Sequence, residues 1–250
     1  MTIHIPEHLA KGHGVAKDGK SFSESAREIG ANWAERFVAY GGLTGNASIL
    51  DVGCGPGRMA IAIGERFGWK NRYLGFDIKA ADIDFSRNAI TSRYANFEFT
   101  WLDVRSPLYN PAGTIEPFAV RFPCEDESFD FCFATSVFTH LYAGVVSLYI
   151  GEAARSLRRE GTFLFTAFVI QPSYSADQKP RFRFHLGPDS TTFVTDSEVA
   201  EEAIGFDFGY LQNLLKTAGF DNIKHYTGGW TGNPDAIAGQ DIIVCQKSTQ

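Results

Sequence analysis

The segment from residue 49 to residue 58 reads Ile49-Leu50-Asp51-Val52-Gly53-Cys54-Gly55-Pro56-Gly57-Arg58, and it is the most informative part of the chain. A short run that suits a buried strand leads into three glycines at alternate positions, and a helical pattern follows. Glycine is needed where a backbone turns tightly, takes a positive φ or approaches a ligand without a Cβ in the way. The segment therefore predicts a ligand-binding loop at the carboxyl edge of a parallel sheet.

Around this loop, strand-like runs alternate with helical patterns, which is typical of a parallel sheet with crossover helices. The expected strands are 49–52, 73–78, 97–102, 129–135, 162–170, 222–226 and 241–246. The expected helices are 21–41, 59–67, 83–93, 145–157 and 210–218. We expect an α/β fold with a Rossmann-like, doubly wound, seven-stranded and mostly parallel sheet, an antiparallel last strand and a lid insertion.

The chain is expected to form a single domain over residues 1–250, with two segments outside the regular pattern. Residues 1–20 are polar and weakly periodic, which predicts a mobile arm. Residues 171–205 interrupt the rhythm of strands and helices, and long insertions of this kind are usually lids or disordered segments. In the first helix, Ile29, Trp33 and Phe37 recur at every fourth position and predict one apolar stripe.

Composition limits the classes of protein to consider. The 250 residues are 44% hydrophobic and 21% charged, which excludes a disordered or fibrous chain. A net charge of −6 disfavours nucleic acid as a partner, and no apolar run approaches the roughly 20 residues that span a bilayer. The first residues lack the features of a secretory signal, and the four cysteines lie far apart, so reduced thiols and a cytoplasmic location are expected.

The glycine loop must be assigned to one of two ligand types. Dinucleotide-binding loops follow G-x-G-x-x-G, whereas this chain has G-x-G-x-G. Asp51 also disfavours a pyrophosphate, because a carboxylate repels a dianion, while it favours a cationic sulfonium ligand with an ammonium end. A nicotinamide-dependent dehydrogenase is therefore the less favoured alternative.

At this point the sequence resembles the class I S-adenosylmethionine-dependent methyltransferases. The segment from Asp51 to Gly57 is similar to their first motif. The resemblance continues at the ends of the second and third strands, where it implies that Asp77 binds the ribose hydroxyls and that Asp103 accepts from the adenine amino group. Later segments continue it in order; they are 122–130, 136–141 and 157–162.

The resemblance implies S-adenosyl-L-methionine as the cofactor. The predicted cofactor-binding residues are Asp51, Gly53, Cys54, Gly55, Gly57, Arg58, Asp77, Ile78, Asp103, Val104, Thr135 and Ser136. No set of ligands predicts a metal ion; His4, His8 and His13 lack a cysteine or acidic partner that would complete a site.

Methyl transfer to a hydroxyl requires that the acceptor lose a proton, and His140 is the candidate base because it follows the fourth strand by a few residues. The alternative is that Thr139 caps the next helix and His140 only packs or forms a structural hydrogen bond. Within the insertion, basic and aromatic residues alternate, which predicts that Arg181, Arg183 and His185 hold an anionic or sugar-like acceptor. A strand with a solvated outer face explains the same pattern.

The acceptor class is inferred from two features. The Asn-Pro-Pro-Tyr type tetrapeptide of enzymes that methylate amino groups of nucleic acids is absent after the fourth strand, where Ala134-Thr135-Ser136-Val137 stands. The C-terminal segments 208–220 and 228–243 look like those of bacterial enzymes of surface-polysaccharide synthesis. We therefore expect O-methylation of a small molecule or glycan hydroxyl. Methylation of nitrogen or carbon, and a cofactor-binding module without turnover, stay open as alternatives, as does the oligomeric state.

Overall fold

The structure, a computed structural model, describes residues 2–10, 19–171, 181–187, 191–195 and 200–249. Residues 1 and 11–18 of the predicted arm, which include His13, and parts of the predicted insertion, which include Lys179 and Pro180, therefore lie outside the described residues. Contacts divide the chain into two compact units, residues 1–123 with 129–131, and residues 124–128 with 132–250. Each unit is described by itself below, and the single domain over residues 1–250 stays a prediction.

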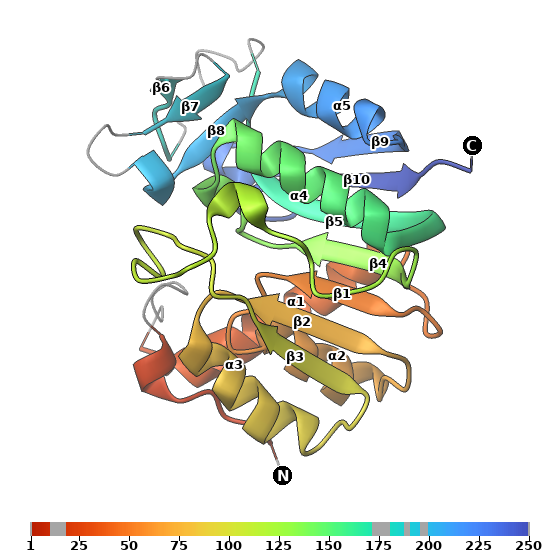
Figure 1. Cartoon of the computed structure of the whole chain (residues 1–250). Helices are drawn as coiled ribbons and strands as arrows, with labels where there is room; N and C mark the ends of the chain where they lie inside the picture. Colours follow the sequence, from red (N-terminus) through yellow and green to blue (C-terminus); the bar gives the residue numbers. More distant parts are fainter. Residues whose placement is uncertain (1, 11–18, 172–180, 188–190, 196–199, 250) are drawn as a thin grey trace. The chain divides into compact units, whose positions relative to one another are not determined.

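In the first unit, parallel strands lie side by side in the order β3-β2-β1, as Figure 1 shows. Ile49 pairs with Tyr73, and Asp77 pairs with Trp101, so the carboxyl ends of neighbouring strands meet at one edge. The elements are η1 (Glu7–Leu9), α1 (Phe22–Ala39), β1 (Ile49–Val52), α2 (Arg58–Phe67), β2 (Tyr73–Asp77), α3 (Ala80–Ser86), η2 (Arg87–Thr91), β3 (Phe97–Trp101) and η3 (Pro117–Ala119). The first residues of β4 (Phe129–Ala134) complete this unit.

Helix α1 begins where the sequence predicts, but it buries a different face. Ser21 and Glu24 form a capping box, in which each side chain accepts from the other residue's main-chain N–H. Of the predicted stripe only Phe37 is buried, and Ile29 is 37% exposed. The buried face instead carries small residues, among them Ala26, Gly30 and Ala34. Small side chains let α1 approach α2 closely, because a Cβ at Gly30 would lie 2.4 Å from the carbonyl oxygen of Arg58.

The described part of the N-terminal arm packs against the start of α1. Ile3, Ile5 and Leu9 are buried. The main-chain N–H of Ile5 donates to Ser23 Oγ at 3.1 Å, and that of Phe22 donates to Glu7 Oε1 at 2.8 Å. These contacts fix residues 2–10 as a packed segment, while the predicted mobility of the arm as a whole stays a prediction.

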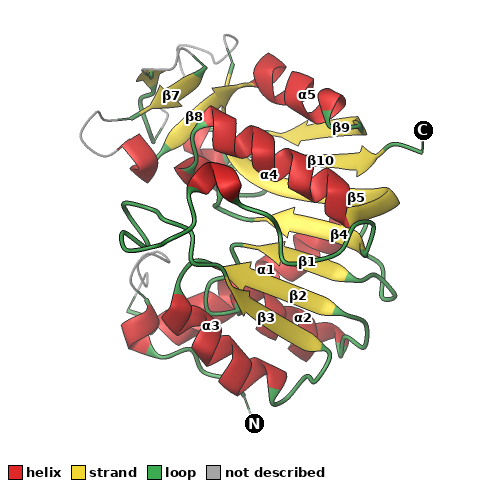
Figure 2. Cartoon of the chain, in the orientation of Figure 1, coloured by secondary structure: helices red, strands yellow, loops and turns green. Residues whose placement is uncertain are grey.

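The second unit holds the rest of the predicted elements, and Figure 2 separates its helices and strands by colour. As predicted, β10 is antiparallel; it pairs with β5 on one side and with β9 on the other. The elements are the end of β4, η4 (Phe138–His140), α4 (Ala143–Ser156), β5 (Leu157–Ile170), α5 (Phe208–Thr217), β9 (Phe220–Tyr226), η6 (Gly229–Thr231) and β10 (Asp241–Lys247). Within the part of the chain that the structure describes, no helix is both long and apolar enough to cross a bilayer.

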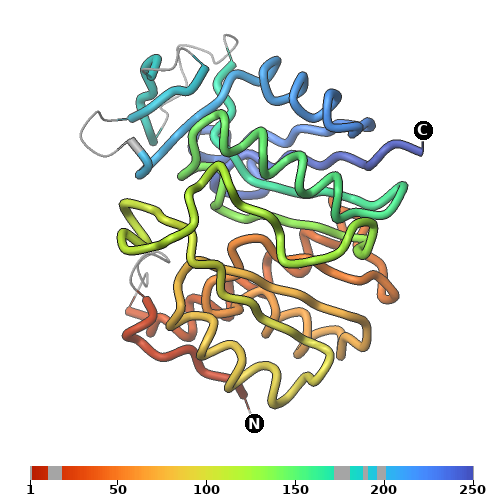
Figure 3. Tube along the Cα trace, viewed as in Figure 1, coloured from red at the N-terminus to blue at the C-terminus, as the bar shows by residue number. Residues whose placement is uncertain are grey.

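The insertion contributes strands that the sequence does not predict. They are β6 (His185–Leu186), β7 (Thr192–Val194) and β8 (Ile204–Asp207), with η5 (Ala200–Glu202) before β8. Strand β8 runs parallel to the last three residues of β5, and β7 and β6 follow it in antiparallel pairs. Figure 3 follows this path along the chain. The described part of the insertion therefore extends the strands of the second unit, so the described strands exceed the predicted seven.

Candidate functional site

The glycine loop between β1 and α2 has the backbone that its sequence predicts. Gly53, Gly55 and Gly57 have φ values of 71°, 53° and 77°, a region that residues with a Cβ avoid. Gly57 is also the N-cap of α2, and a Cβ there would lie 2.3 Å from Ile90 Cδ1. The backbone conformation at these three positions therefore requires glycine, and at Gly57 the packing against Ile90 requires it as well.

Asp77 at the end of β2 is held against this loop. Its Oδ2 accepts from the N–H of Gly55 at 2.7 Å, and its Oδ1 accepts from the N–H of Lys79 at 2.9 Å. Each carboxylate oxygen has two lone pairs, so these bonds orient the group while leaving acceptor capacity for a diol. The glycine loop thus fixes the orientation of Asp77, the residue that is predicted to bind the ribose.

Asp51 lies beneath the loop and is 1% exposed. It accepts a hydrogen bond from the Tyr73 hydroxyl at 2.5 Å. Burial raises the pKa of Asp51 to about 7, and the nearby charge of Asp77 adds to this rise, while the Tyr73 hydrogen bond and the charge of Arg58 oppose it. Arg58 is half-buried, and the loss of water around it lowers its pKa. A carboxyl group that changes its charge near neutrality therefore sits under the cofactor loop.

Several main-chain groups of the loop are engaged within the protein. The N–H groups of Gly53 and Cys54 both donate to the carbonyl of Phe76, at 2.9 and 3.0 Å. The Cys54 side chain is buried, as expected for a small apolar residue, and burial raises the pKa of its thiol well above the usual value. These residues shape the loop through their backbone rather than through reactive side chains.

At the end of β3 the predicted adenine ligands are engaged by the segment that follows. Asn110 and Thr114 donate to the Asp103 carboxylate, and the N–H of Val104 donates to the carbonyl of Leu102 at 2.8 Å. Ile78, after β2, has a half-buried side chain, and its carbonyl accepts from the Trp101 indole N–H at 3.1 Å.

In the second unit, the turn after β4 is held by residues distant in sequence. Ser136 has a φ of 57°, and its N–H donates to Thr166 Oγ1 at 2.7 Å. Thr166 Oγ1 in turn donates to Gln240 Oε1 at 2.6 Å, and Ser136 Oγ donates to the same oxygen at 3.1 Å. A non-glycine residue in the left-handed region persists only where its surroundings hold it there, and such residues cluster at functional sites. Thr135, next to this turn, is buried.

His140 belongs to the same unit, in η4. Its Nδ1 lies 2.7 Å from the carbonyl oxygen of Glu201. Because a carbonyl only accepts, Nδ1 carries the proton, and Nε2 is the acceptor nitrogen of the neutral ring. Burial lowers the pKa of His140, and the Glu201 carbonyl partly offsets this effect. Thr139 does not cap the following helix: the N-cap of α4 is Tyr142, and Thr139 is buried with no hydrogen-bond partner for its hydroxyl among the described residues.

In the insertion, the residues that are predicted to hold the acceptor differ in exposure from the aromatic residues between them. Arg181, Arg183 and His185 are exposed. The intervening Phe182 and Phe184 pack instead on Phe168 and Trp230, in a small aromatic cluster of the second unit. The ring centroids of Phe168 and Phe182 lie 5.2 Å apart, and those of Phe184 and Trp230 lie 5.3 Å apart. The apolar side anchors this segment, so the basic groups face solvent from a fixed backbone.

The sequence did not predict the role of Asp241, a fully buried acid of the second unit. Asp241 has 0% exposure and accepts four hydrogen bonds. The donors are Val169 N, Gly228 N, His225 Nε2 and Trp230 Nε1, at 2.9, 3.1, 2.9 and 2.5 Å. Its sequence signal is an acid at the start of a strand whose next four residues are apolar. Thr166 and Gln240 give no local signal, since their partners lie 30 to 104 residues away.

Glycines in the left-handed region beside an oriented carboxylate fit an adenosyl sulfonium, which makes the first unit the candidate cofactor site of an α/β protein. Residues 50–165 match the family described as "Methyltransferase domain". An uncharacterized protein from Haemophilus influenzae is 27% identical over 150 residues, which are 60% of this chain and 53% of that relative. The chain thus spans about half the length of this relative.

Solved structures share the fold. A methyltransferase from Methanosarcina mazei matches with a TM-score of 0.55 and 18% identity, over 85% of this chain and 98% of that one. The 1,6-didemethyltoxoflavin-N1-methyltransferase of Burkholderia thailandensis, solved with S-adenosylhomocysteine, gives 0.52 and 14%, over 90% and 79%. The [4+2]-cyclase SpnF gives 0.57 and 16%, over 98% and 91%.

The solved structures show a Rossmann-like α/β fold, and residues 50–165 match a methyltransferase domain. More narrowly, these findings support a class I S-adenosylmethionine-dependent methyltransferase with S-adenosylmethionine as its cofactor. The matched residues include the glycine loop, Asp77 and the turn after β4. The match therefore supports the expectation drawn from the first motif.

Proposed function

We propose that this enzyme methylates a hydroxyl group of a small molecule or glycan, with His140 as the proton acceptor. The cofactor supplies an electrophilic methyl group on a sulfonium. The protein's part is to hold the acceptor oxygen in line and to take its proton, and such positioning lowers the barrier by several kcal/mol.

The observation that carries this proposal is the orientation of the His140 ring. The Glu201 carbonyl fixes the proton on Nδ1, so Nε2 has the lone pair that a base needs. Burial keeps the ring neutral at physiological pH, because it lowers the pKa. A ring held in one tautomer and uncharged is ready to accept a proton from a hydroxyl group.

The acceptor class is supported by the insertion. Arg181, Arg183 and His185 offer positive or hydrogen-bonding groups from a backbone anchored by Phe182 and Phe184. Arg181 also lies over the Phe182 ring at 5.3 Å, a cation–π contact that restrains its head group. An anionic or sugar-like molecule suits such groups. The free thiols of all four cysteines are consistent with a reducing compartment, and we place the enzyme in the cytoplasm.

Two alternatives compete with this proposal. One neighbour in fold is named an N1-methyltransferase, and nitrogen acceptors need no base if they are already neutral amines. Another is named a cyclase, so the fold also serves a protein named for a different reaction. A binding module without turnover belongs to this second possibility.

Methyl transfer to a panel of hydroxyl, amine and thiol acceptors, with S-adenosylmethionine and the full chain, tests the proposal. We expect turnover on a hydroxyl compound, and a loss of about 10²–10⁴ in kcat for His140→Ala, with unchanged affinity for S-adenosylhomocysteine. The exposed His8 provides the matched control, and His8→Ala should behave as wild type. Turnover on amines alone, or full activity of His140→Ala at every pH, contradicts the proposal.

A further inference from the structure

A cluster of hydrogen bonds joins β4, β5 and β10 within the second unit, and Gln240 lies at its centre. Strand β10 is antiparallel to β5, with Asp241 opposite Ala167, so the start of β10 lies beside the carboxyl-terminal part of β5. The turn at Ser136 follows the carboxyl end of β4. Sheets of this kind bind their ligands outside the carboxyl ends of their strands. Gln240 therefore lies at the edge of the second unit where a ligand is expected.

The main chain around Gln240 is fixed on both sides. Before it, the N–H of Trp230 donates to the Gly239 carbonyl at 2.9 Å. A Cβ at Gly228 would lie 2.4 Å from the carbonyl carbon of Gln240, so the two backbones touch and only glycine fits there. After it, Asp241 accepts four hydrogen bonds. Gln240 thus presents its side chain from a backbone that is held in one place.

Two hydroxyl groups orient the carboxamide of Gln240. Thr166 Oγ1 accepts from the Ser136 N–H at 2.7 Å, and its own proton is directed to Gln240 Oε1 at 2.6 Å. Ser136 Oγ donates to the same oxygen at 3.1 Å. Because both donors meet Oε1, the NH2 group of the amide is turned away from the cluster.

The NH2 group of Gln240 donates to no residue in the part of the chain that the structure describes. Gln240 is half-buried, and its Nε2 is not among the buried polar atoms that lack a partner, so solvent reaches this nitrogen. An amide NH2 group has two donors and no acceptor. A molecule that binds here must therefore offer lone pairs, as a hydroxyl, carbonyl or carboxylate oxygen does.

Gln240 is also connected to the segment of the insertion that carries Arg181. The N–H of Arg181 donates to the Trp230 carbonyl at 2.7 Å, and the N–H of Trp230 donates to the Gly239 carbonyl. Two successive main-chain hydrogen bonds thus join the residue before Gln240 to the segment that is proposed to hold the acceptor. This connection favours the acceptor as the molecule that Gln240 contacts.

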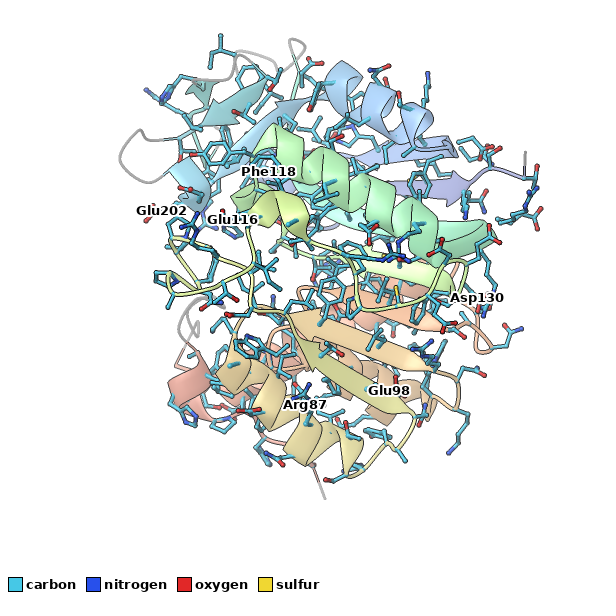
Figure 4. All side chains as sticks on the ribbon, in the orientation of Figure 1. Arg87, Glu98, Glu116, Phe118, Asp130 and Glu202 are labelled. Atoms are coloured by element: carbon cyan, nitrogen blue, oxygen red, sulfur yellow. The ribbon has the colours of Figure 1, made fainter. Side chains whose placement is uncertain are left out.

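The proposed base belongs to the same unit. Ser136, whose hydroxyl reaches Gln240, is followed within a few residues by η4 and His140. The His140 ring is held by the carbonyl of Glu201, and Figure 4 labels the next residue, Glu202, which is exposed. The turn after β4 therefore links, along the chain, the proposed base to the residue that bonds Gln240.

We infer that Gln240 binds the acceptor: its NH2 group donates a hydrogen bond to an oxygen of that molecule other than the atom that is methylated. The inference rests on the proposed methyl transfer, but it does not depend on which element receives the methyl group. It requires an acceptor with a further oxygen, as in a polyhydroxyl compound. Ser136 and Thr166 act through Gln240 and are positioning residues for this contact.

Derivatives that lack one hydroxyl group test the contact, in assays of the full chain with S-adenosylmethionine. The probes are glucose, galactose, glucuronate and glucosamine, each with its single deoxy derivatives. For the sugar that turns over, we expect one deoxy derivative to raise KM by about tenfold or more, because it leaves the Gln240 donor unpaired. The value of kcat should change by less than about threefold, as the loss of a uniform binding contact requires.

Variants of Gln240 show whether this residue makes the contact. Gln240→Glu keeps an oxygen for both hydroxyl donors but loses the NH2 group, and Gln240→Met removes both functions without adding a charge. Each should raise KM for the parent sugar by about tenfold and remove the difference between parent and deoxy derivative, because both changes delete one hydrogen bond.

Gln246→Glu is the matched control, because this exposed glutamine lies on the same strand and its Oε1 accepts from Asn222 Nδ2 at 2.9 Å. It should change neither KM nor the effect of the deoxy derivative. The affinity of all three variants for S-adenosylhomocysteine, measured by calorimetry, should stay within about twofold of wild type, since the contact is with the acceptor.

Three results overturn the inference: no effect of any deoxy derivative in wild type, an effect that persists in both Gln240 variants, or a loss of S-adenosylhomocysteine affinity in Gln240→Glu. Methylation of the glucosamine nitrogen alone contradicts only O-methylation, because the deoxy comparison on that sugar still tests Gln240. Turnover of no sugar contradicts both the proposed glycan acceptor and this inference. Thermal unfolding identifies a variant that fails to fold, and the other Gln240 variant then carries the test.

Discussion

Asp51 in the first unit and Asp241 in the second are both buried, and their surroundings affect the two carboxyl groups in opposite ways. Asp51, under the cofactor loop, accepts one hydrogen bond from the Tyr73 hydroxyl, and its pKa rises to about 7. Asp241, at the start of β10, accepts four hydrogen bonds. Burial alone does not determine how a carboxyl group behaves, because the donors around it can replace the lost water. Asp51 therefore remains a titratable carboxyl group, whereas Asp241 is a hydrogen-bond acceptor that holds several segments of the second unit together.

The largest effect on stability is expected from a substitution of Asp241. Asp241→Asn leaves two of the four donors facing an amide N–H group, and an unsatisfied buried donor costs about 1–3 kcal/mol. We expect a loss of about 4 kcal/mol in the free energy of unfolding, measured with denaturant. Asp235→Asn, at an exposed position, should cost less than about 0.5 kcal/mol. Equal costs at the two positions would remove the contrast between Asp241 and an ordinary surface acid.

The next effect tests whether Asp51 titrates. Its folded-state pKa is raised from 3.8 to about 7, so protonated Asp51 favours folding, and its contribution is full below about pH 4 and is lost as the pH rises toward 7. Asp51→Asn has no such loss. From about pH 5 to about pH 8, the variant should gain about 3 kcal/mol in unfolding free energy relative to wild type. A difference that does not change with pH would mean that Asp51 stays charged.

A smaller effect distinguishes crowding from backbone strain in the cofactor loop. Gly57→Ala forces a Cβ against Ile90 and keeps a left-handed backbone, which should cost about 2–3 kcal/mol of stability. Gly68, at the other end of α2, has a similar φ of 57° with nothing within 4 Å. Gly68→Ala should therefore cost only about 1 kcal/mol. The difference between the two losses of unfolding free energy measures the cost of the contact with Ile90. Equal losses would mean that the glycine loop or Ile90 moves to accommodate the added methyl group.

The smallest effect on stability is expected from the exposed side of the insertion. The double change Arg181→Ala with Arg183→Ala should alter the unfolding free energy by less than about 0.5 kcal/mol. It should nevertheless raise KM several-fold for an anionic acceptor, once the panel has identified one. Phe184→Ala, on the packed side, should instead destabilise by about 2 kcal/mol or more. Similar stability losses on both sides would mean that the arginines are structural.

The predicted strands and helices are confirmed where their signals are local. The glycine loop, the strand ends with Asp77 and the capping box of α1 all depend on residues within a few positions of one another. The buried face of α1 was predicted wrongly, because alanine and glycine carry little hydrophobic signal although they decide how closely two helices approach. Strands β6 to β8 are two to four residues long, too short for a period to be visible.

Much of the second unit could not be predicted from the sequence for a different reason. The network of Ser136, Thr166 and Gln240 joins three segments of the chain, and each member alone is an ordinary polar residue. Asp103 illustrates the limit at the cofactor side: its place at a strand end suggested a ligand, while its partners Asn110 and Thr114 become visible only in the folded chain. Local sequence patterns predict the helices and strands, whereas hydrogen-bond partners that are distant in sequence are known only from the tertiary structure.

The contact between α1 and α2 at Gly30 links the N-terminal helix to the cofactor loop. The carbonyl that a methyl at Gly30 would strike belongs to Arg58, the residue on which the loop ends and α2 begins. The absence of a side chain at Gly30 therefore determines how closely α1 packs against the first residue of α2. In a shortened or engineered form of this protein, residues 22–39 should be kept, because they support the helix that follows the glycine loop. Gly30→Ala would disturb the packing of both helices.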